Sequence, residues 1–203
     1  MNIGIIDFGV GNINSIFSMY RYLGIVSKVV ESSNEIEDLD KIILPGVGSF
    51  DYGMKSIHER GLFEILNYKA LVQKVPILGI CLGMQIITNG SDEGNQNGFS
   101  WIDGFSKKFN LKEDNLKVPH MGWNDFIIKN DHPLMKEVDH KGRFYFSHSY
   151  HVTCHEKIIV AQTNYGYNFP SIIAKDNIIG VQFHPEKSHK FGMQILHNFA
   201  LKL

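Results

Sequence analysis

Short apolar runs alternate with amphipathic segments along the first part of the chain. Unbroken apolar runs are typical of buried strands, whereas apolar residues three and four positions apart are typical of a helix with one buried face. On this basis strands are predicted over residues 2–7, 25–30, 41–44 and 76–80, and helices over residues 12–23, 52–57 and ahead of Pro76. The regular alternation of the two predicts an α/β fold.

The pattern weakens between residues 94 and 142 and then returns. The weak region is rich in Gly, Asn, Asp and Lys, which favours turns and hairpins over long helices. Beyond it, strands are predicted over residues 143–146, 158–162, 171–174 and 178–183, and a closing amphipathic helix from about Phe191. Because the chain has no repeat, low-complexity tract or proline-rich linker, we expect residues 1–203 to form a single domain.

Composition and charge narrow the classes of partner. Hydrophobic residues make up 43% of the 203 residues and charged residues 20%, and the net charge is -1. A chain this neutral, with no long basic run, lacks the field that attracts nucleic acid or an anionic membrane surface. It has two cysteines, Cys81 and Cys154, and its apolar N-terminal run is not typical of a signal peptide, so we expect a reducing, cytoplasmic location.

The strongest chemical signal is Gly79-Ile80-Cys81-Leu82-Gly83, which joins a predicted buried strand to a predicted helix. This is the form of a nucleophile elbow, a strained turn in which flanking glycines let strand and helix approach closely. Unpaired amides at a helix start favour the thiolate, which is the form of cysteine that attacks carbonyl groups. Most free cysteines are small buried hydrophobes, but the two glycines at this junction favour a nucleophile.

A base for this nucleophile is expected in Val181-Gln182-Phe183-His184-Pro185-Glu186. A strand ending at Phe183 would deliver His184 to the carboxyl edge of the sheet, where the sites of α/β proteins lie. Glu186 could accept the other imidazole N–H and orient the ring. Both could instead be ordinary polar residues after a strand, since the chain has 10 histidines. Their joint position favours a triad of Cys81, His184 and Glu186.

Amide hydrolysis also needs donors for the oxyanion that develops on the attacked carbonyl group. The amide that follows a nucleophile is the usual first donor, and here it belongs to Leu82. The second donor has to come from another loop. Gly46 and Gly48 follow a predicted strand and leave the backbone at Val47 free to turn an amide inward. A simple turn explains the same glycines equally well.

Two weaker patterns do not carry a function. Gly9-Val10-Gly11 follows the first predicted strand as a dinucleotide-binding loop would, but Asn14 occupies the position of the third glycine, so NAD binding is rejected. The histidines and cysteines do not have the spacing of a zinc site. We therefore expect no metal and no cofactor.

Taken together, these motifs resemble the class I glutamine amidotransferases. The nucleophile motif extends through Met84 and Gln85, and His184-Pro185-Glu186 matches the rest of the family's triad. The similarity runs end to end and is greatest to the glutaminase subunits of imidazole glycerol phosphate synthases. It is carried by Asp7-Phe8-Gly9-Val10-Gly11-Asn12, Pro45-Gly46-Val47-Gly48, Pro119-His120-Met121-Gly122-Trp123-Asn124, His148-Ser149-Tyr150 and residues 182–188.

The resemblance implies a flavodoxin-like domain with a mostly parallel central sheet flanked by helices. It implies that the protein hydrolyses glutamine to glutamate and ammonia through a glutamyl thioester on Cys81. The residues implied to bind glutamine are Gln85 and Glu93, at its amino-acid head group, and Gly48, Ser149 and Tyr150, which would line the same pocket.

The resemblance also implies a partner and a means of activation. The partner would be a separate synthase subunit of (β/α)₈-barrel type, which forms a heterodimer with the glutaminase and uses its ammonia in histidine biosynthesis. The residues implied to lie near this interface are Asn12, Met121 and Trp123. The Gly46–Val47 peptide would reorient on activation, so that Val47 and Leu82 together form the oxyanion hole and the unstimulated activity is low.

Three segments depart from the pattern usual in the histidine pathway. Residues 49–54, 164–169 and 189–192 look more like paralogues that supply ammonia to sugar-amidinating enzymes of surface polysaccharide synthesis. None of these segments includes a triad residue, so they change the expected ammonia acceptor and not the expected chemistry. A cysteine hydrolase or peptidase on the same scaffold, and a regulatory subunit that only binds a partner, are the alternatives from other classes.

Overall fold

The computed structural model of the protein describes residues 1–112, 116–139 and 141–203. The strands of its central sheet are β1 (Ile3–Ile6), β2 (Ser27–Val30), β3 (Lys41–Leu44), β4 (Ile77–Ile80), β7 (Ile127–Ile128), β10 (Ile159–Tyr165), β11 (Tyr167–Lys175) and β12 (Ile178–Val181). They form an eight-stranded sheet in the order β2-β1-β3-β4-β12-β11-β10-β7. From β2 to β12 the pairs are parallel, and from β12 to β7 they are antiparallel.

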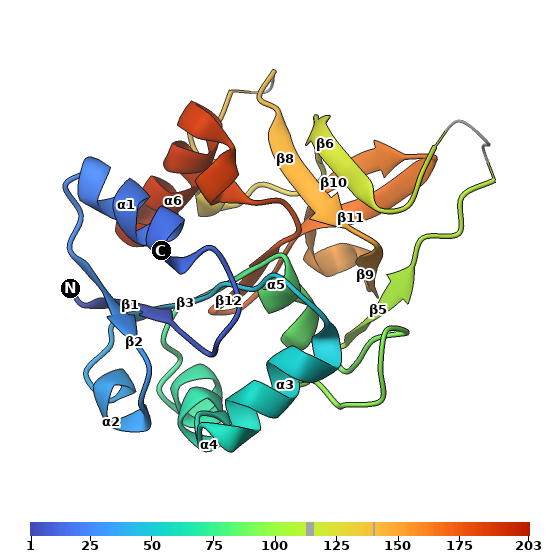
Figure 1. Cartoon of the computed structure of the whole chain (residues 1–203). Helices are drawn as coiled ribbons and strands as arrows, with labels where there is room; N and C mark the ends of the chain where they lie inside the picture. Colours follow the sequence, from blue (N-terminus) through green and yellow to red (C-terminus); the bar gives the residue numbers. More distant parts are fainter. Residues whose placement is uncertain (113–115, 140) are drawn as a thin grey trace.

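Helices cover both faces of this sheet (Figure 1). One face is covered by α1 (Ile13–Tyr22) and α6 (His189–Lys202), whose buried side chains share a core cluster with the central strands. The other face is covered by α2 (Ser33–Ile36), α3 (Phe50–Glu59), α4 (Phe63–Asn67) and α5 (Leu82–Ile86), and a π-helical segment, Tyr68–Val72, continues α4. No helix in the part of the chain that the structure describes is long and apolar enough to cross a membrane.

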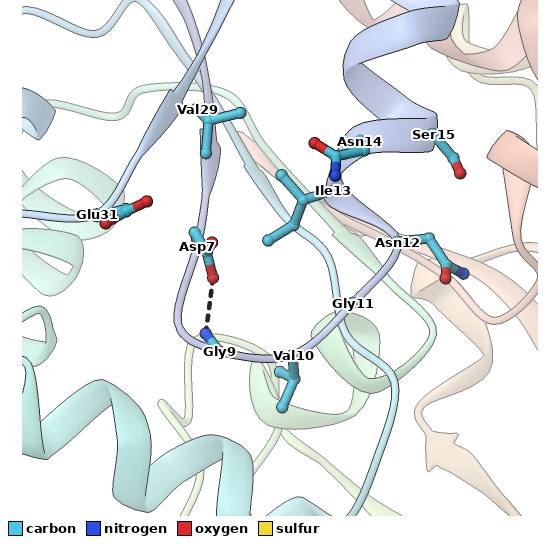
Figure 2. Close-up of a pocket in the computed structure, with 10 residues that line it drawn as sticks. All are labelled: Asp7, Gly9, Val10, Gly11, Asn12, Ile13, Asn14, Ser15, Val29 and Glu31. Atoms are coloured by element: carbon cyan, nitrogen blue, oxygen red, sulfur yellow. Dashed lines mark hydrogen bonds between the residues drawn. The ribbon is translucent and has the colours of Figure 1, made fainter.

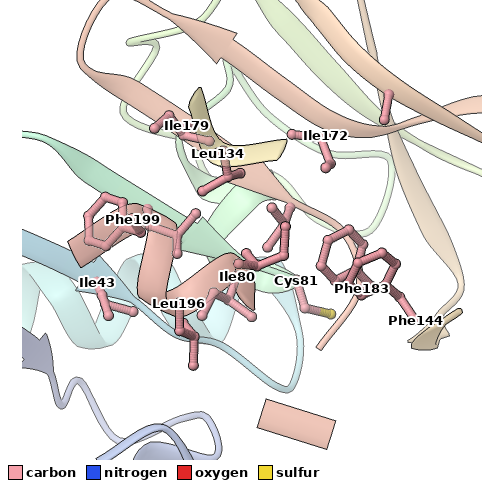
Figure 3. Close-up of a cluster of buried hydrophobic side chains, with 14 of the residues drawn as sticks. Ile43, Ile80, Cys81, Leu134, Phe144, Ile172, Ile179, Phe183, Leu196 and Phe199 are labelled. Atoms are coloured by element: carbon pink, nitrogen blue, oxygen red, sulfur yellow. The ribbon is translucent and has the colours of Figure 1, made fainter. Parts of the chain in front are cut away.

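Strands with unbroken apolar sequences contribute side chains to the core on both faces of the sheet, because successive side chains point to opposite faces. In β3, Ile43 packs against the cluster under α1 and α6, whereas Ile42 and Leu44 pack against the cluster under α2 to α5. Figure 3 shows the first of these clusters, with Cys81 beside Ile80 and Phe183. The apolar runs that predicted parallel strands are therefore buried on both sides, as such strands require.

Two small antiparallel sheets extend the domain beyond the central one. β5 (Gly104–Lys108) pairs with β9 (Tyr150–Cys154), and β6 (His120–Asn124) pairs with β8 (Phe144–His148). Short 3₁₀ helices lie at Pro133–Met135, Glu156–Ile158 and Pro185–Lys187. The expectation that residues 94–142 would form no long helix is confirmed for the described part of this region, but the expected hairpins are not found, because β5 and β6 pair with β9 and β8, which lie beyond residue 142.

The predicted α/β fold is confirmed, with two omissions and several changed boundaries. β3 coincides with its predicted range, but β10 and β11 are longer than predicted because they form one long hairpin. β9 was not predicted, because its polar residues interrupt any apolar run. α2 was also missed, although Ser32 and Glu35 form a capping box, which is a local signal for a helix start.

Candidate active site

Cys81 lies at the tight turn between β4 and α5. Its backbone has φ 53° and ψ −104°, a combination that side-chain-bearing residues rarely adopt. Strain of this kind persists where surrounding structure enforces it, and it is found at functional sites. The thiol is buried beside the end of β4 and borders a pocket. The predicted nucleophile elbow is therefore present in the backbone geometry.

The two glycines of the elbow permit the close approach of backbone segments. A Cβ atom on Gly83 would lie 1.8 Å from the carbonyl oxygen of Leu44, on the neighbouring strand. A Cβ atom on Gly79 would lie 2.5 Å from the carbonyl oxygen of Gly83. Both contacts are with backbone atoms, which cannot move aside as a flexible side chain would. The predicted reason for these glycines is confirmed.

The structure brings His184 and Glu186 to the same edge of the sheet. His184 follows β12, the strand that pairs with β4, and the amide of Cys81 donates to the carbonyl oxygen of Val181 at 2.8 Å. Nδ1 of His184 lies 2.8 Å from Oε1 of Glu186, and the side chains of both are almost completely buried. Cys81 is close enough to the imidazole to raise the pKa of His184.

The electrostatics of the site favour the charged forms of His184 and Glu186. Burial alone would lower the pKa of His184, but the adjacent Cys81 thiolate and the Glu186 carboxylate raise it to about 10. Burial likewise opposes ionisation of Glu186, yet hydrogen bonds from His184 and Asn12 hold its pKa below the usual value. Nδ2 of Asn12 donates to the same Oε1 atom at 2.8 Å. The arrangement keeps the imidazolium next to sulfur and the carboxylate behind it.

A pocket of about 240 Å³ opens next to Cys81. The five residues expected to contact glutamine all line it, and so do both expected oxyanion residues. Its lining residues are Val47, Gly48, Cys81, Leu82, Gln85, Glu93, Pro119, Ser147, His148, Ser149 and Tyr150. The sequence motifs that are far apart in the chain are thus brought to one cavity.

The polar residues of the pocket are held by further contacts. Oε2 of Glu93 accepts a hydrogen bond from the amide of Phe50, at the start of α3, at 2.8 Å. The carboxylate of Asp51 accepts from the amides of Asn95 and Gln96 at 3.0 and 2.9 Å. The loop that carries Glu93 is therefore tied to the first turn of α3, and its side chain is oriented before any ligand binds.

The backbone after β3 does not present an open oxyanion hole. The amide of Leu82 donates to the carbonyl oxygen of Gly46 at 3.4 Å, so the first expected donor already has a partner within the protein. Val47 is 46% exposed, so its side chain is not held by packing. The Gly46–Val47 peptide has its carbonyl group, and not an amide, turned toward Leu82.

The residues expected near a partner interface differ in their surroundings. Met121 and Trp123 lie two positions apart on β6 and are 62% and 38% exposed. Trp123 belongs to neither core cluster, and its indole ring stacks on the His189 imidazole with ring centroids 5.2 Å apart. Asn12 is half-buried, and its side chain contacts Glu186. Asn12 therefore touches the triad directly.

Two residues at the site, His148 and Gln182, belong to the sequence motifs but had no predicted role. His148 lines the cavity, and its Nδ1 lies 2.7 Å from the carbonyl oxygen of Tyr150. Gln182 is completely buried, and its Nε2 lies 3.7 Å from Sγ of Cys81. A signal for Gln182 was present in the sequence, because a polar amide at the end of an apolar strand must find buried partners.

A second hollow, of about 700 Å³, lies beside the loop between β1 and α1. Figure 2 shows its lining, with the amide of Gly9 donating to Asp7 Oδ1 at 2.8 Å across the turn. Asp7 and Glu31 make this hollow acidic, which does not suit the phosphates of a dinucleotide. Over the described residues, no group of three or more His, Cys, Asp or Glu side chains is placed to hold a metal ion.

Comparison with known sequences identifies close relatives. A family model described as "Glutamine amidotransferase class-I" matches residues 4–203. A protein of Methanococcus maripaludis named "Imidazole glycerol phosphate synthase subunit HisH 2" is 48% identical over 200 residues, which cover 97% of this chain and 98% of that protein. A protein of the same name from Pseudomonas aeruginosa is 43% identical over 197 residues, which cover 97% of both chains.

Solved structures agree with the fold. A crystal structure described as a glutamine amidotransferase superposes with a TM-score of 0.74 at 16% identity and covers 98% of this chain and 97% of its own. The structure of PurLQS from Thermotoga maritima superposes with a TM-score of 0.73 at 19% identity, covering 99% of this chain and 97% of that one. At such identities the likeness concerns the fold alone. The family match over almost the whole chain goes further, and the chain belongs to the class-I glutamine amidotransferase family.

Proposed function

We propose that this chain is the glutaminase subunit of an imidazole glycerol phosphate synthase and forms a single glutamine amidotransferase domain over residues 1–203. The observation that carries the chemistry is the buried contact of Cys81, His184 and Glu186 at the edge of a small polar pocket. Two relatives named as subunits of this synthase are 43% and 48% identical over nearly the whole chain, which supports the choice within the family.

The reaction begins with attack of the Cys81 thiolate on the side-chain amide carbon of glutamine. A tetrahedral intermediate forms, and His184 gives its proton to the amine that leaves as ammonia. The product is a glutamyl thioester on Cys81. His184, now neutral, takes a proton from a water molecule that attacks the thioester, and glutamate leaves as the thiolate is restored. Glu186 keeps the ring oriented and stabilises its charged form.

The pocket residues divide between binding and stabilisation of the oxyanion. Gln85 and Glu93 are polar side chains at positions suited to the charged amino-acid head group, and Gly48, Ser149 and Tyr150 complete the walls. Leu82 and Val47 would donate to the oxyanion after the Gly46–Val47 peptide turns over. The existing contact between Leu82 and Gly46 supports low activity in the absence of a stimulus.

The partner would be a synthase subunit of (β/α)₈-barrel type. The exposed Met121 and Trp123 on β6 offer it an apolar contact next to the pocket wall at Pro119. Asn12 offers a route from the same interface to the triad, through its hydrogen bond to Glu186. Ammonia released at Cys81 would then pass to the barrel, which uses it on a phosphorylated ribulosyl substrate in histidine biosynthesis.

Glutamate release tests this proposal directly. The protein would be assayed alone, with the barrel subunit, and with the barrel subunit plus the ribulosyl ligand. Strong stimulation that requires both is the expected result. Stimulation only by a sugar-amidinating enzyme would instead assign the protein to surface polysaccharide synthesis. The departures at residues 49–54, 164–169 and 189–192 favour this alternative. Hydrolysis of peptides without hydrolysis of glutamine would overturn both.

A further inference from the structure

Gln182 is a buried residue whose side-chain amide contacts two residues of the site, Cys81 and Gln85. Its side chain is completely buried directly after β12, where its chain neighbours Val181 and Phe183 are apolar. Buried amides are retained only where hydrogen bonds satisfy them. Here Nε2 lies 3.7 Å from Sγ of Cys81, and Oε1 lies 3.4 Å from Nε2 of Gln85. Gln182 therefore sits between the nucleophile and a pocket residue.

The carbonyl group of Tyr150 fixes which way both amides point. Nε2 of Gln85 lies 3.0 Å from this oxygen, and a carbonyl oxygen can only accept. Gln85 must therefore present its NH₂ group there, and the second N–H of that group points to Gln182. Gln182 must in turn present its oxygen to Gln85 and its NH₂ group to Cys81. The opposite orientation of either side chain would place two donors or two acceptors together.

A histidine contact supports the same orientation. Nδ1 of His148 lies 2.7 Å from the Tyr150 carbonyl oxygen, so this nitrogen carries a proton and donates. Nε2 of His148 then accepts from Nδ1 of His120 at 3.0 Å. The Tyr150 oxygen thus receives two donors, one from His148 and one from Gln85, and these hold the carbonyl group in place at the pocket wall.

The direction of these hydrogen bonds leaves an acceptor on Gln85 at one end of the series and a donor on Gln182 at the other. Both N–H groups of Gln85 are engaged and Gln85 lines the pocket, so its Oε1 atom is the part of this amide that remains to accept a hydrogen bond from an ammonium group. At the other end, an N–H group points to the sulfur atom. Unlike His184, an amide does not lose its proton during the reaction, so this donor is present at every stage.

We propose that Gln182 is a further catalytic residue, which donates a hydrogen bond to the Cys81 thiolate and is oriented by Gln85. This rests on the proposed glutaminase function, because a thiolate nucleophile is what the donor would serve. The link through Gln85 couples the binding of the glutamine head group to the support of the nucleophile two side chains away. A thiolate that loses this donor is less stable relative to the thiol.

Alkylation of Cys81 by iodoacetamide as a function of pH tests the proposal. Cys154 is replaced first, as Cys154→Ser, so that only one thiol reacts. In this background Gln182→Met removes the donor and keeps the length of the side chain. The pH midpoint of alkylation should rise by about one unit, as expected for the loss of one hydrogen bond to a charged group. An unchanged midpoint would overturn the proposal.

The other titratable groups around Cys81 are the same with and without Gln182→Met, so their effects on the alkylation midpoint cancel in the comparison. They are His184 with Glu186 behind it, and Glu93, His148 and Tyr150 on the pocket wall. Gln85→Met provides a second variant, in which Gln182 stays but loses its orienting partner. Its midpoint should shift in the same direction by a smaller amount, and it decides the matter if Gln182→Met does not fold.

The alkylation experiment is independent of the proposed function, because it needs neither glutamine nor a partner. If stimulated glutaminase activity is found but Gln182→Met leaves the midpoint unchanged, only the role of Gln182 fails. In the stimulated enzyme, Gln182→Met should lower kcat roughly tenfold with little change in KM, whereas Gln85→Met should also raise KM. A variant of Gln182 that changes KM alone would assign this residue to binding and contradict the proposal.

Discussion

The amide of Leu82 is hydrogen-bonded to the carbonyl oxygen of Gly46 at 3.4 Å. An oxyanion on the substrate would also need a hydrogen bond from this amide. The oxyanion and the Gly46 carbonyl oxygen therefore compete for the same donor. Rotation of the Gly46–Val47 peptide would withdraw the carbonyl oxygen and turn the Val47 amide toward the same point. One backbone movement would therefore remove an acceptor and supply a second donor.

The first prediction concerns the Val47 amide. Val47→Pro removes this N–H and should reduce stimulated glutaminase activity by roughly 10²- to 10³-fold, the usual effect of losing one oxyanion donor. Val47→Ala keeps the amide and serves as the matched control, with activity close to that of the wild type. Steady-state glutamate release with the partner present measures both. Equal activities of the two variants would exclude the Val47 amide as a donor.

The second prediction concerns the strained backbone of Cys81. Glycine normally destabilises a protein relative to alanine, because it has more freedom in the unfolded chain. At φ 53° and ψ −104° the order should reverse, since only glycine adopts these angles without strain. We expect Cys81→Gly to be more stable than Cys81→Ala by about 1 kcal/mol. Urea unfolding measures this difference, and both variants should lack glutaminase activity.

The third prediction concerns the protonation of His184. Burial lowers its pKa, but Cys81 and Glu186 raise it to about 10. Taken alone, a raised pKa contributes stability that is complete below the unfolded value of about 6.5 and is lost as the pH rises through the folded value. NMR of the ring nitrogens should show an imidazolium at pH 8 in the wild type. Cys81→Ala should titrate at lower pH, because the largest contribution that raises the pKa is gone.

The fourth prediction concerns the hydrogen bond from Asn12 to Glu186. Asn12→Ala should lower the free energy of unfolding by about 1 kcal/mol at neutral pH, and Asn12→Asp by more, because two carboxylates would then face each other. As the pH falls, one of these two carboxyl groups binds a proton and can then donate a hydrogen bond to the other. The deficit of Asn12→Asp should therefore shrink in urea unfolding at about pH 4.5. A constant deficit would argue against this contact.

The fifth prediction concerns the exposed tryptophan of β6. Trp123→Ala should weaken binding of the barrel subunit roughly tenfold or more, as expected for an aromatic residue near the centre of an interface. Tyr22→Ala is the control, since Tyr22 is 78% exposed at the end of α1 and has no expected partner role. Titration calorimetry compares the two. Similar affinities for both variants would place the interface elsewhere.

Much of the site could be predicted because it depends on local sequence. The spacing of Gly79, Cys81 and Gly83 reflects backbone contacts that only glycine permits, and these contacts are present. A short connection after a strand restricts where His184 and Glu186 can lie. The predicted strands likewise rest on apolar runs, and the fold confirms them.

The remaining features depend on contacts between distant segments. The orientation of the Gly46–Val47 peptide is a choice between two conformations of the same sequence, so no residue pattern specifies it. The contact of Asn12 with Glu186 joins residues 174 positions apart. The role we propose for Gln182 follows from the direction of hydrogen bonds that meet at Tyr150, and that direction becomes visible only when all the partners are placed.

The nucleophile and its base follow two strands that are hydrogen-bonded neighbours, β4 and β12. The distance between these two strands is fixed by their backbone hydrogen bonds, at about 4.8 Å in any sheet. The segments that would distinguish one ammonia acceptor from another lie on other parts of the chain. Natural variation can therefore redirect the product to a new recipient while the geometry of the chemical step is inherited unchanged.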